Sequence, residues 1–271
     1  MGKLVVRVCG CGNCPVFIAD SFFRLKSNLC FGSPYIKQKL KMKRDMRSCT
    51  FIAVLLSFVF VGCQEVTVKV GEDFLSHKTN EFNITVEYPV FTSQRMEVDQ
   101  ECKVVNGQIM RLIDSLQNDL KIQVKEYVQK AQEMKEEPML PFELDIKDSV
   151  FMADHHYISV RLSVYTLAGG ANGLTEYYAF NYSLKDKKFL TSQEILNYDK
   201  SAEIDKQIQK SFKNPDNCFT EVPNLVNVTT VNFTGSDICF TYNPLVLGAH
   251  YCGAAEISVP RMLLKGDLLL K

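Results

Sequence analysis

The sequence predicts an α+β fold, with antiparallel sheets, one long amphipathic helix and short helices. The first observation is a stretch from residue 106 to residue 138, in which apolar side chains recur every three or four positions, as on one face of a helix. The second is a set of segments in which apolar and polar residues alternate, as in strands with one buried face. Strands interspersed with one long and two short helices are typical of the α+β class.

The first predicted strand covers residues 82–88, which alternate in polarity and end before Pro89. The long helix follows. Asn106 is a suitable N-cap, and Pro138 ends the helix because proline disfavours helical geometry in the residue before it. The apolar stripe of this helix is formed by Ile109, Leu112, Ile113, Leu116, Leu120, Val124, Tyr127, Val128 and Ala131. We expect the stripe to pack on a sheet or on another helix.

Three further strands lie on either side of a glycine-rich loop. Residues 142–152 and 157–167 are the first two, separated by a short polar turn. Residues 167–173 contain three glycines, which tolerate the positive φ of a tight turn or bulge. The third strand covers residues 175–183.

The C-terminal part predicts two short helices and three closing strands. Thr191 and Glu194 have the spacing of a capping box, which starts the first helix. Residues 201–212 form the second helix, with one apolar face. The closing strands are predicted at residues 226–233, 237–242 and 256–259.

A short apolar segment near the N-terminus predicts export. Basic residues precede an apolar run at residues 51–61, and Gly62 and Cys63 close it. This is the order of a secretory signal peptide, and a cysteine at the cleavage point is the pattern of a bacterial lipoprotein. We therefore predict a signal peptide at residues 42–62 and a diacylglycerol on Cys63 that anchors the chain to a membrane. An uncleaved transmembrane anchor is the alternative, but the run is shorter than the ~17 residues that a spanning helix needs.

The signal peptide sets the predicted domain organisation. Residues 1–41 precede it and are interpreted as an over-extended N-terminus outside the fold, because a signal peptide belongs at the N-terminus. A metal site is the competing interpretation, but their clustered cysteines lack the second pair of such a site. Residues 63–80 are mixed and polar, which favours a tether. Residues 81–167 then form an N-terminal α+β domain, and residues 168–271 form a C-terminal domain.

Charge and cysteine content limit the classes of function. The chain has 31 basic and 31 acidic residues, so no net field favours nucleic acid. Export places the mature chain in the bacterial cell envelope, facing the periplasm or the exterior. Four cysteines follow Cys63, namely Cys102, Cys218, Cys239 and Cys252. They permit two disulfides in three pairings, or buried free thiols, and we expect at least one bridge among the last three.

Two sequence blocks carry a resemblance to a known family. The first is Gly169-Gly-Ala-Asn-Gly173 followed by residues 179–191, and the second is Phe240-Thr-Tyr-Asn-Pro244 followed by residues 248–260. Together they resemble the C-terminal domain shared by RsiV-type anti-sigma factors and PdaC-type peptidoglycan deacetylases. Residues 81–167 are similar in layout to the companion domain that precedes it. The resemblance implies an exported domain, which also occurs alone in lipoproteins of unknown role.

The chain departs from this family at three positions. Asn172 stands where the family usually has histidine, and Leu245 and His250 stand where it has tyrosines. A ligand contact through those family residues is therefore in doubt here. The glycine loop, the second block and the strand tyrosines supply the candidate ligand-binding residues, which are Gly169, Gly170, Asn172, Gly173, Tyr178, Tyr242 and Asn243.

The sequence favours a non-catalytic role. Adjacent His155 and His156 would point to opposite faces of a strand, so they do not chelate one metal. His250 and Cys252, even with Cys239, lack a fourth zinc ligand. No nucleophile elbow or phosphate loop is present. We expect no catalytic residue, no metal and no cofactor.

These observations favour a lipid-anchored envelope module that binds a protein, such as a muramidase, or peptidoglycan. One alternative is an RsiV-like anti-sigma sensor, which requires a full membrane span. A second alternative is an unrecognised envelope hydrolase.

Overall fold

The computed structural model describes residues 68–270. The predictions for the N-terminal extension, the signal peptide at residues 42–62 and lipidation of Cys63 lie outside the described residues. Within the described part, no helix is both long enough and apolar enough to cross a membrane.

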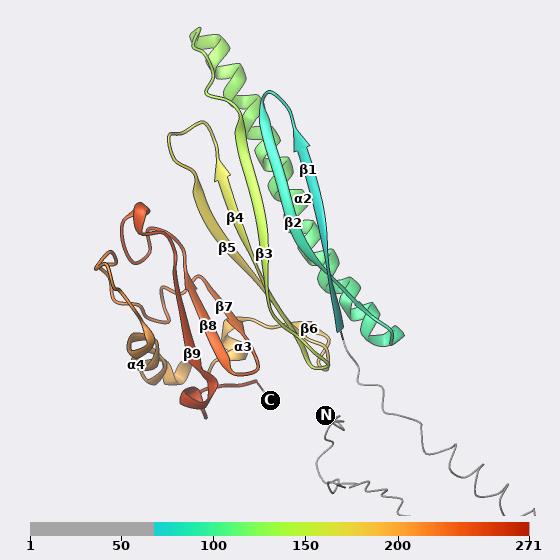
Figure 1. Ribbon diagram of the computed structural model, residues 1–271, viewed down its shortest axis with the longest axis vertical. Coiled ribbons are helices and arrows are strands. Elements are labelled where there is room, and N and C mark those ends of the chain that lie inside the picture. Colours follow the sequence, from blue (N-terminus) through green and yellow to red (C-terminus); the bar gives the residue numbers. More distant parts are fainter. Residues whose placement is uncertain (1–67, 271) are drawn as a thin grey trace, which may run out of the picture. The chain divides into compact units, whose positions relative to one another are not determined.

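The larger sheet of the described residues has six strands in the order β1-β2-β3-β4-β5-β6 (Figure 1). The strands are β1 (Val68–Lys78), β2 (Phe82–Ser93), β3 (Phe142–Ala153), β4 (Tyr157–Leu167), β5 (Leu174–Ser183) and β6 (Lys188–Phe189). The β2–β3 pair is parallel, and the other neighbouring pairs are antiparallel. A parallel pair needs a crossover connection, which the long helix provides. The predicted α+β class is confirmed.

Helix α2 (Met96–Met134) makes that connection and packs on one face of the sheet. Its buried side chains are Cys102, Val105, Ile109, Ile113, Leu120, Val124 and Ala131. The predicted start at Asn106 is wrong, because the helix begins ten residues earlier, after Arg95. Asn106 instead exchanges two hydrogen bonds with the backbone of Phe91, at 2.9 and 2.8 Å, and so joins the helix to β2.

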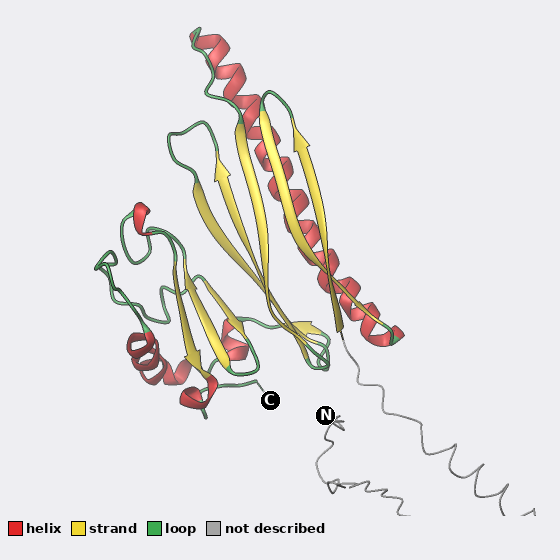
Figure 2. Cartoon of the chain, in the orientation of Figure 1, coloured by secondary structure: helices red, strands yellow, loops and turns green. Residues whose placement is uncertain are grey.

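A second, three-stranded sheet lies on the opposite face from α2, against β4 and β5. It consists of β7 (Thr230–Phe233), β8 (Asp237–Tyr242) and β9 (Ala255–Pro260). Helices α3 (Ser192–Ile195) and α4 (Ser201–Ser211) accompany it, together with the 3₁₀ turns η1 (Tyr198–Lys200), η2 (His250–Cys252) and η3 (Arg261–Leu264) (Figure 2). The predicted capping box of Thr191 and Glu194 is present at the start of α3.

Each sheet has its own apolar core. The first core lies between α2 and the larger sheet, and the second lies between the smaller sheet and α4. Buried polar side chains join the two sheets. Ser159 donates to Asn181 at 2.7 Å, Asn232 donates to Ser159 at 3.1 Å, and Asn181 donates to the carbonyl of Val231 at 2.8 Å. Buried hydrogen bonds of this kind fix the geometry of a contact, although the Oδ1 of Asn232 has no partner among the described residues.

Two predictions near the start of the described residues are wrong. The segment at 68–78 is not a tether, because it forms β1 and pairs with β2 along its whole length. Most of its side chains are exposed, so its sequence carries no burial pattern.

Strand β2 also continues past Pro89. The parallel pairing with β3 ends at Val86, so the missing N–H of Pro89 removes no hydrogen bond on that side.

The predicted boundary between residues 167 and 168 stays a prediction. The larger sheet crosses this point, because β4 and β5 are antiparallel neighbours from Tyr157 and Ser183 to Thr166 and Leu174. The described residues, 68–270, all belong to one compact unit.

Candidate ligand-binding groove along strand β5

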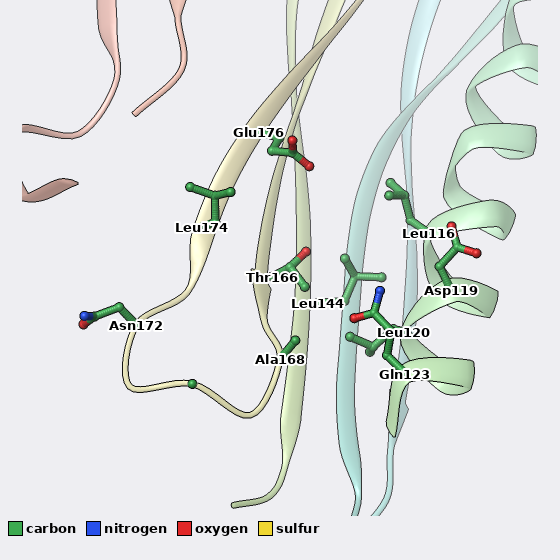
Figure 3. A pocket seen from close by; sticks show the side chains of 11 residues that line it. Leu116, Asp119, Leu120, Gln123, Leu144, Thr166, Ala168, Asn172, Leu174 and Glu176 are labelled. Carbon is green, nitrogen blue, oxygen red and sulfur yellow. The ribbon is translucent and has the colours of Figure 1, made fainter. Parts of the chain in front are cut away.

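The first cavity lies between α2 and the end of β5, beside the glycine-rich loop. Its volume is about 390 Å³. Figure 3 shows Leu116 and Asp119 on α2 and Leu174 and Glu176 on β5, with Leu144 between the two elements. The other lining residues are Leu120, Gln123, Thr166, Ala168, Gly170 and Asn172. The cavity is therefore a space that the helix leaves uncovered on its face of the sheet.

The second cavity lies further along the same strand. Its volume is about 510 Å³. It is lined by residues of α2, β5, β7 and the segment before α3, namely Gln108, Leu112, Tyr177, Tyr178, Ala179, Phe180, Asn181, Leu190, Thr191, Ser192, Thr229, Thr230 and Val231. Most of these side chains carry a hydroxyl or an amide, so the cavity offers many hydrogen-bonding groups.

The two cavities follow each other along α2 and β5, and we call their combined lining the β5 groove. On the helix side it runs from Gln108 to Gln123. At a rise of 1.5 Å per residue, this stripe is about 22 Å long. The groove is thus long enough for an extended segment of several residues.

The outer edge of β5 adds unpaired backbone groups to the groove. Strand β6 pairs only with Tyr182 and Ser183, and the Leu190 N–H donates to the Asn181 carbonyl at 2.7 Å. That bond shows that odd-numbered residues of β5 direct their backbone groups away from β4. Thr175, Tyr177 and Ala179 therefore present N–H and C=O groups on an edge that no described strand covers.

The charged groups of the groove are acidic. Asp119 and Glu176 are its carboxylates, and neither cavity is lined by Lys, Arg or His. The Tyr178 hydroxyl donates to Glu176 at 3.2 Å. Burial, followed by the negative charge of Glu176, raises the pKa of Tyr178 above its ordinary value. The groove therefore disfavours anionic ligands and suits neutral or cationic ones.

Thr230 supplies an unsatisfied polar atom at the second cavity. Its side chain is 7 % exposed, and its Oγ1 has no hydrogen-bond partner among the described residues. Buried hydroxyls are nearly always hydrogen-bonded, because leaving one unpaired costs about 1–3 kcal/mol. Because Oγ1 itself is buried, a ligand in this cavity would remove that cost only when the Thr230 side chain turns toward it.

The glycine loop contains both groove residues and structural residues. Gly170 and Asn172 line the first cavity, although the Asn172 side chain points away from α2 (Figure 3). Gly169 has φ +70°, which favours glycine. A Cβ at Gly173 would lie 2.3 Å from the end of the Tyr165 ring, so a side chain at this position would have to displace that ring.

The other candidate residues divide between the groove and the core. Tyr178 lines the second cavity. Tyr242 does not, because it is fully buried and its hydroxyl donates to the Asn224 carbonyl at 3.0 Å. Tyr242 therefore lies in the core, and a ligand contact by it stays a prediction. The Asn243 N–H donates to Thr229 at 2.9 Å, and Asn243 lies outside both cavities.

Two of the residues weighed as metal ligands, Cys252 and His250, have other partners. Cys218 and Cys252 form a disulfide, while Cys102 and Cys239 are free. The His250 Nε2 lies 2.9 Å from the Gly173 carbonyl oxygen and so connects η2 to the glycine loop. Over residues 68–270, no group of three His, Cys, Asp or Glu side chains is placed to hold a metal.

Sequence reasoning missed the helix side of the groove and Thr230. The helix residues had a detectable signal, since Gln108, Leu112, Leu116, Asp119 and Gln123 recur at helical spacing beside the buried stripe. Thr230 had no detectable signal in the sequence, because its position at the groove depends on the packing of β7 beside β5.

Comparison with known families supports the predicted resemblance. Residues 75–175 match the family model described as Deacetylase PdaC. The chain resembles the PdaC family over these residues. The matched segment contains α2 and the glycine loop, and it ends as β5 begins. The resemblance block that starts at Phe240 lies beyond it. No curated protein matches the chain.

Two solved structures are similar to the chain. One is a member of the DUF3298 family from Bacteroides fragilis NCTC 9343, with 13% identity and a TM-score of 0.55, covering 76% of this chain and 95% of that chain. The other is a DUF3298 family protein from Pseudomonas aeruginosa PAO1, with 14% identity and a TM-score of 0.49, covering 74% of this chain and 94% of that chain. The first likeness shows that the α+β arrangement is shared across nearly the whole of that chain.

Proposed function

We propose that this protein is a non-catalytic binding module of the bacterial cell envelope, which holds an extended protein segment in the β5 groove. The observation that carries the proposal is the unpaired edge of β5, bordered by the unpartnered hydroxyl of Thr230. An extended peptide can add to such an edge through main-chain hydrogen bonds, while neighbouring pockets receive its alternate side chains.

The chemistry of the groove favours protein over peptidoglycan. Asp119 and Glu176 attract cationic side chains, and the lining holds no cation for the carboxylates of a peptidoglycan stem peptide. A cationic muramidase fits this charge pattern. Peptidoglycan binding is the alternative outcome of the test below.

The proposed location rests on the sequence. Lipidation at Cys63 would leave only four residues before β1 begins at Val68. The start of β1 would then lie close to the membrane surface, on the periplasmic or exterior side. The anti-sigma sensor and the hydrolase remain alternatives, and no feature of the groove favours either.

Binding of a purified muramidase and of soluble peptidoglycan fragments to the full chain, measured by titration calorimetry, tests the proposal. We expect the muramidase to bind and Thr230→Val to weaken that binding by about five-fold, the value of one hydrogen bond. Valine keeps the shape of threonine, and removal of an unsatisfied hydroxyl does not destabilise the fold. Thr92→Val is the matched control, because Thr92 is exposed on β2 and lies outside both cavities.

Three outcomes would contradict the proposal. Binding of peptidoglycan alone would show that the ligand class is wrong. Equal muramidase affinities for Thr230→Val and Thr92→Val would show that the ligand binds elsewhere. Binding of neither probe would remove the support for a muramidase-type partner.

A further inference from the structure

Strand β1 forms one edge of the larger sheet, and the β5 groove lies near the opposite edge. It is eleven residues long, and every residue after Val68 is exposed. Three of these exposed side chains are apolar: Val70 is 44 % exposed, Phe74 is 55 % exposed and Leu75 is 36 % exposed. A long edge strand with apolar side chains is a ready template for pairing with another strand.

The backbone of β1 can accept a partner strand in defined registers. Thr79 directly follows β1, and its N–H donates to the Phe82 carbonyl at 2.8 Å. Thr79 and Phe82 are therefore a hydrogen-bonded pair of the β1–β2 ladder. Odd-numbered residues of β1 therefore direct their backbone groups toward β2, and even-numbered residues direct theirs outward. When a second copy pairs antiparallel with β1 about a two-fold axis at any one residue, even-numbered residues lie opposite even-numbered residues. The backbone therefore permits self-association, in which the Phe74 N–H exchanges its present bond to the Asp73 carboxylate, at 2.9 Å, for a bond to the second copy.

The side chains of β1 favour one of these registers. When two copies are centred on Leu75, Glu72 lies opposite Lys78 and Asp73 lies opposite His77, each twice by symmetry. Opposite charges directly across an antiparallel pair are stabilising. Centring on Asp73 would place that carboxylate opposite itself. Centring on Phe74 would place Lys78 opposite Val70.

We propose that β1 pairs antiparallel with β1 of a second copy of this chain, about a two-fold axis at Leu75. The pairing joins two six-stranded sheets into one continuous sheet and covers the exposed side chains of Phe74 and Leu75. The interface is isologous, because the same surface is used on both copies. It leaves the β5 groove of each copy open, and it does not depend on the proposed function.

Cysteine cross-linking tests the register. At the two-fold axis the two Leu75 residues form a non-hydrogen-bonded pair, whose Cα atoms are about 4.5 Å apart, within the range of a disulfide. In the full chain purified in detergent, the Leu75→Cys variant is expected to form a disulfide between the introduced thiols of two copies under mild oxidation. Phe74→Cys, the matched control, is expected to link much more slowly. Mixed ¹⁴N and ¹⁵N chains identify the link as intermolecular by mass spectrometry.

A charge exchange tests the pairing without cysteines. We expect Lys78→Glu to raise the dimer dissociation constant by about five-fold, because it places two carboxylates opposite each other at both ends. The double variant Glu72→Lys with Lys78→Glu restores opposite charges and is expected to recover the original constant in sedimentation experiments.

The proposal is overturned by any of four results. These are a monomer at all concentrations, equal linking by Phe74→Cys, no effect of Lys78→Glu, or a dimer of the double variant no tighter than that of Lys78→Glu. A link from the thiol introduced by Leu75→Cys to a cysteine upstream of residue 68 would show that the same chain covers the edge. Co-purification of a different protein on β1 would assign the edge to that partner instead.

Discussion

Arg161 of β4 and Glu256 of β9 join the two sheets, with Nη2 of the arginine 2.9 Å from Oε1 of the glutamate. The arginine side chain is 7 % exposed and the glutamate side chain is 53 % exposed, so the pair is buried at one end only. Nη1 of Arg161 also donates to Thr241 at 2.6 Å, and the guanidinium lies 4.7 Å from the ring centroid of Tyr177. The arginine is thus held by charge, hydrogen bonding and packing together.

Loss of Arg161 should therefore cost more than loss of its ionic partner. We expect Arg161→Ala to lower the free energy of unfolding by about 2–4 kcal/mol, because it opens a cavity between the sheets and leaves Thr241 unpaired. Glu256→Gln should cost less than about 1 kcal/mol, since a half-exposed pair is screened by water. Urea unfolding of both variants checks this order. Equal losses would show that the ion pair, and not the packing, joins the sheets.

The buried tyrosines should make the protein sensitive to alkali. Burial, then the hydrogen bond to Glu101 at 2.5 Å, raises the pKa of Tyr182 well above its ordinary value. Burial also raises the pKa of Tyr242. The folded state then binds more protons than the unfolded state above about pH 10, so stability falls as pH rises. Below that pH the stabilisation is fully present.

Above about pH 10, each such tyrosine should lower the free energy of unfolding by about 1.4 kcal/mol per pH unit. Urea unfolding between about pH 9 and pH 12 measures this slope. Tyr182→Phe should reduce it, while replacement of the exposed Tyr251 by Phe should leave it unchanged. An unchanged slope in Tyr182→Phe would contradict the linkage.

The disulfide between Cys218 and Cys252 should stabilise the second sheet and its loops. It closes a loop with a sequence separation of 34 residues. Loop entropy in the unfolded chain predicts a loss of about 3–4 kcal/mol when both cysteines are replaced by serine. Cys239→Ser is the control, because Cys239 is a free thiol. A thermal shift of equal size in the two variants would show that the bridge adds no stability.

Gly173 should be intolerant of any side chain. A Cβ there would lie 2.3–2.5 Å from three atoms of Tyr165, whereas at Gly170 the nearest atom is 3.8 Å away. We expect Gly173→Ala to cost about 1–3 kcal/mol through overpacking, and Gly170→Ala to be tolerated. Combining Gly173→Ala with Tyr165→Ala should recover part of the loss, as measured by thermal unfolding. No recovery would place the strain elsewhere.

Elements with alternating polarity were predictable from the sequence, and the exposed edge strand was not. The predicted bounds of β4 and β8 match those of the structure, because apolar and polar residues alternate along each strand and the turns beside it are polar. Strand β1 was missed because every residue after Val68 is exposed, so the strand has no burial pattern and is held by pairing with β2. The helix start was misplaced because Asn106, a good N-cap by type, binds the Phe91 backbone instead.

The candidate site was predictable only where local sequence determines it. The glycine loop drew attention to Gly170 and Asn172, and alternation drew attention to Tyr178, all of which line the groove. Tyr242 has the same local signals but lies in the second core, because the packing of α4 and β9 decides its burial. Thr230 depends on a contact between distant segments, which single-residue patterns do not contain.

Residue-resolved hydrogen exchange on β5, with and without a bound muramidase, tests the central claim most directly. The outward-facing amides of Thr175, Tyr177 and Ala179 should exchange fast in the free chain and become protected on binding, because a ligand strand accepts their hydrogen bonds. The amides of Tyr178 and Phe180 already bond to β4 and should change little. Unchanged exchange at all three outward-facing amides, in a chain saturated with muramidase, would contradict a ligand strand at this edge.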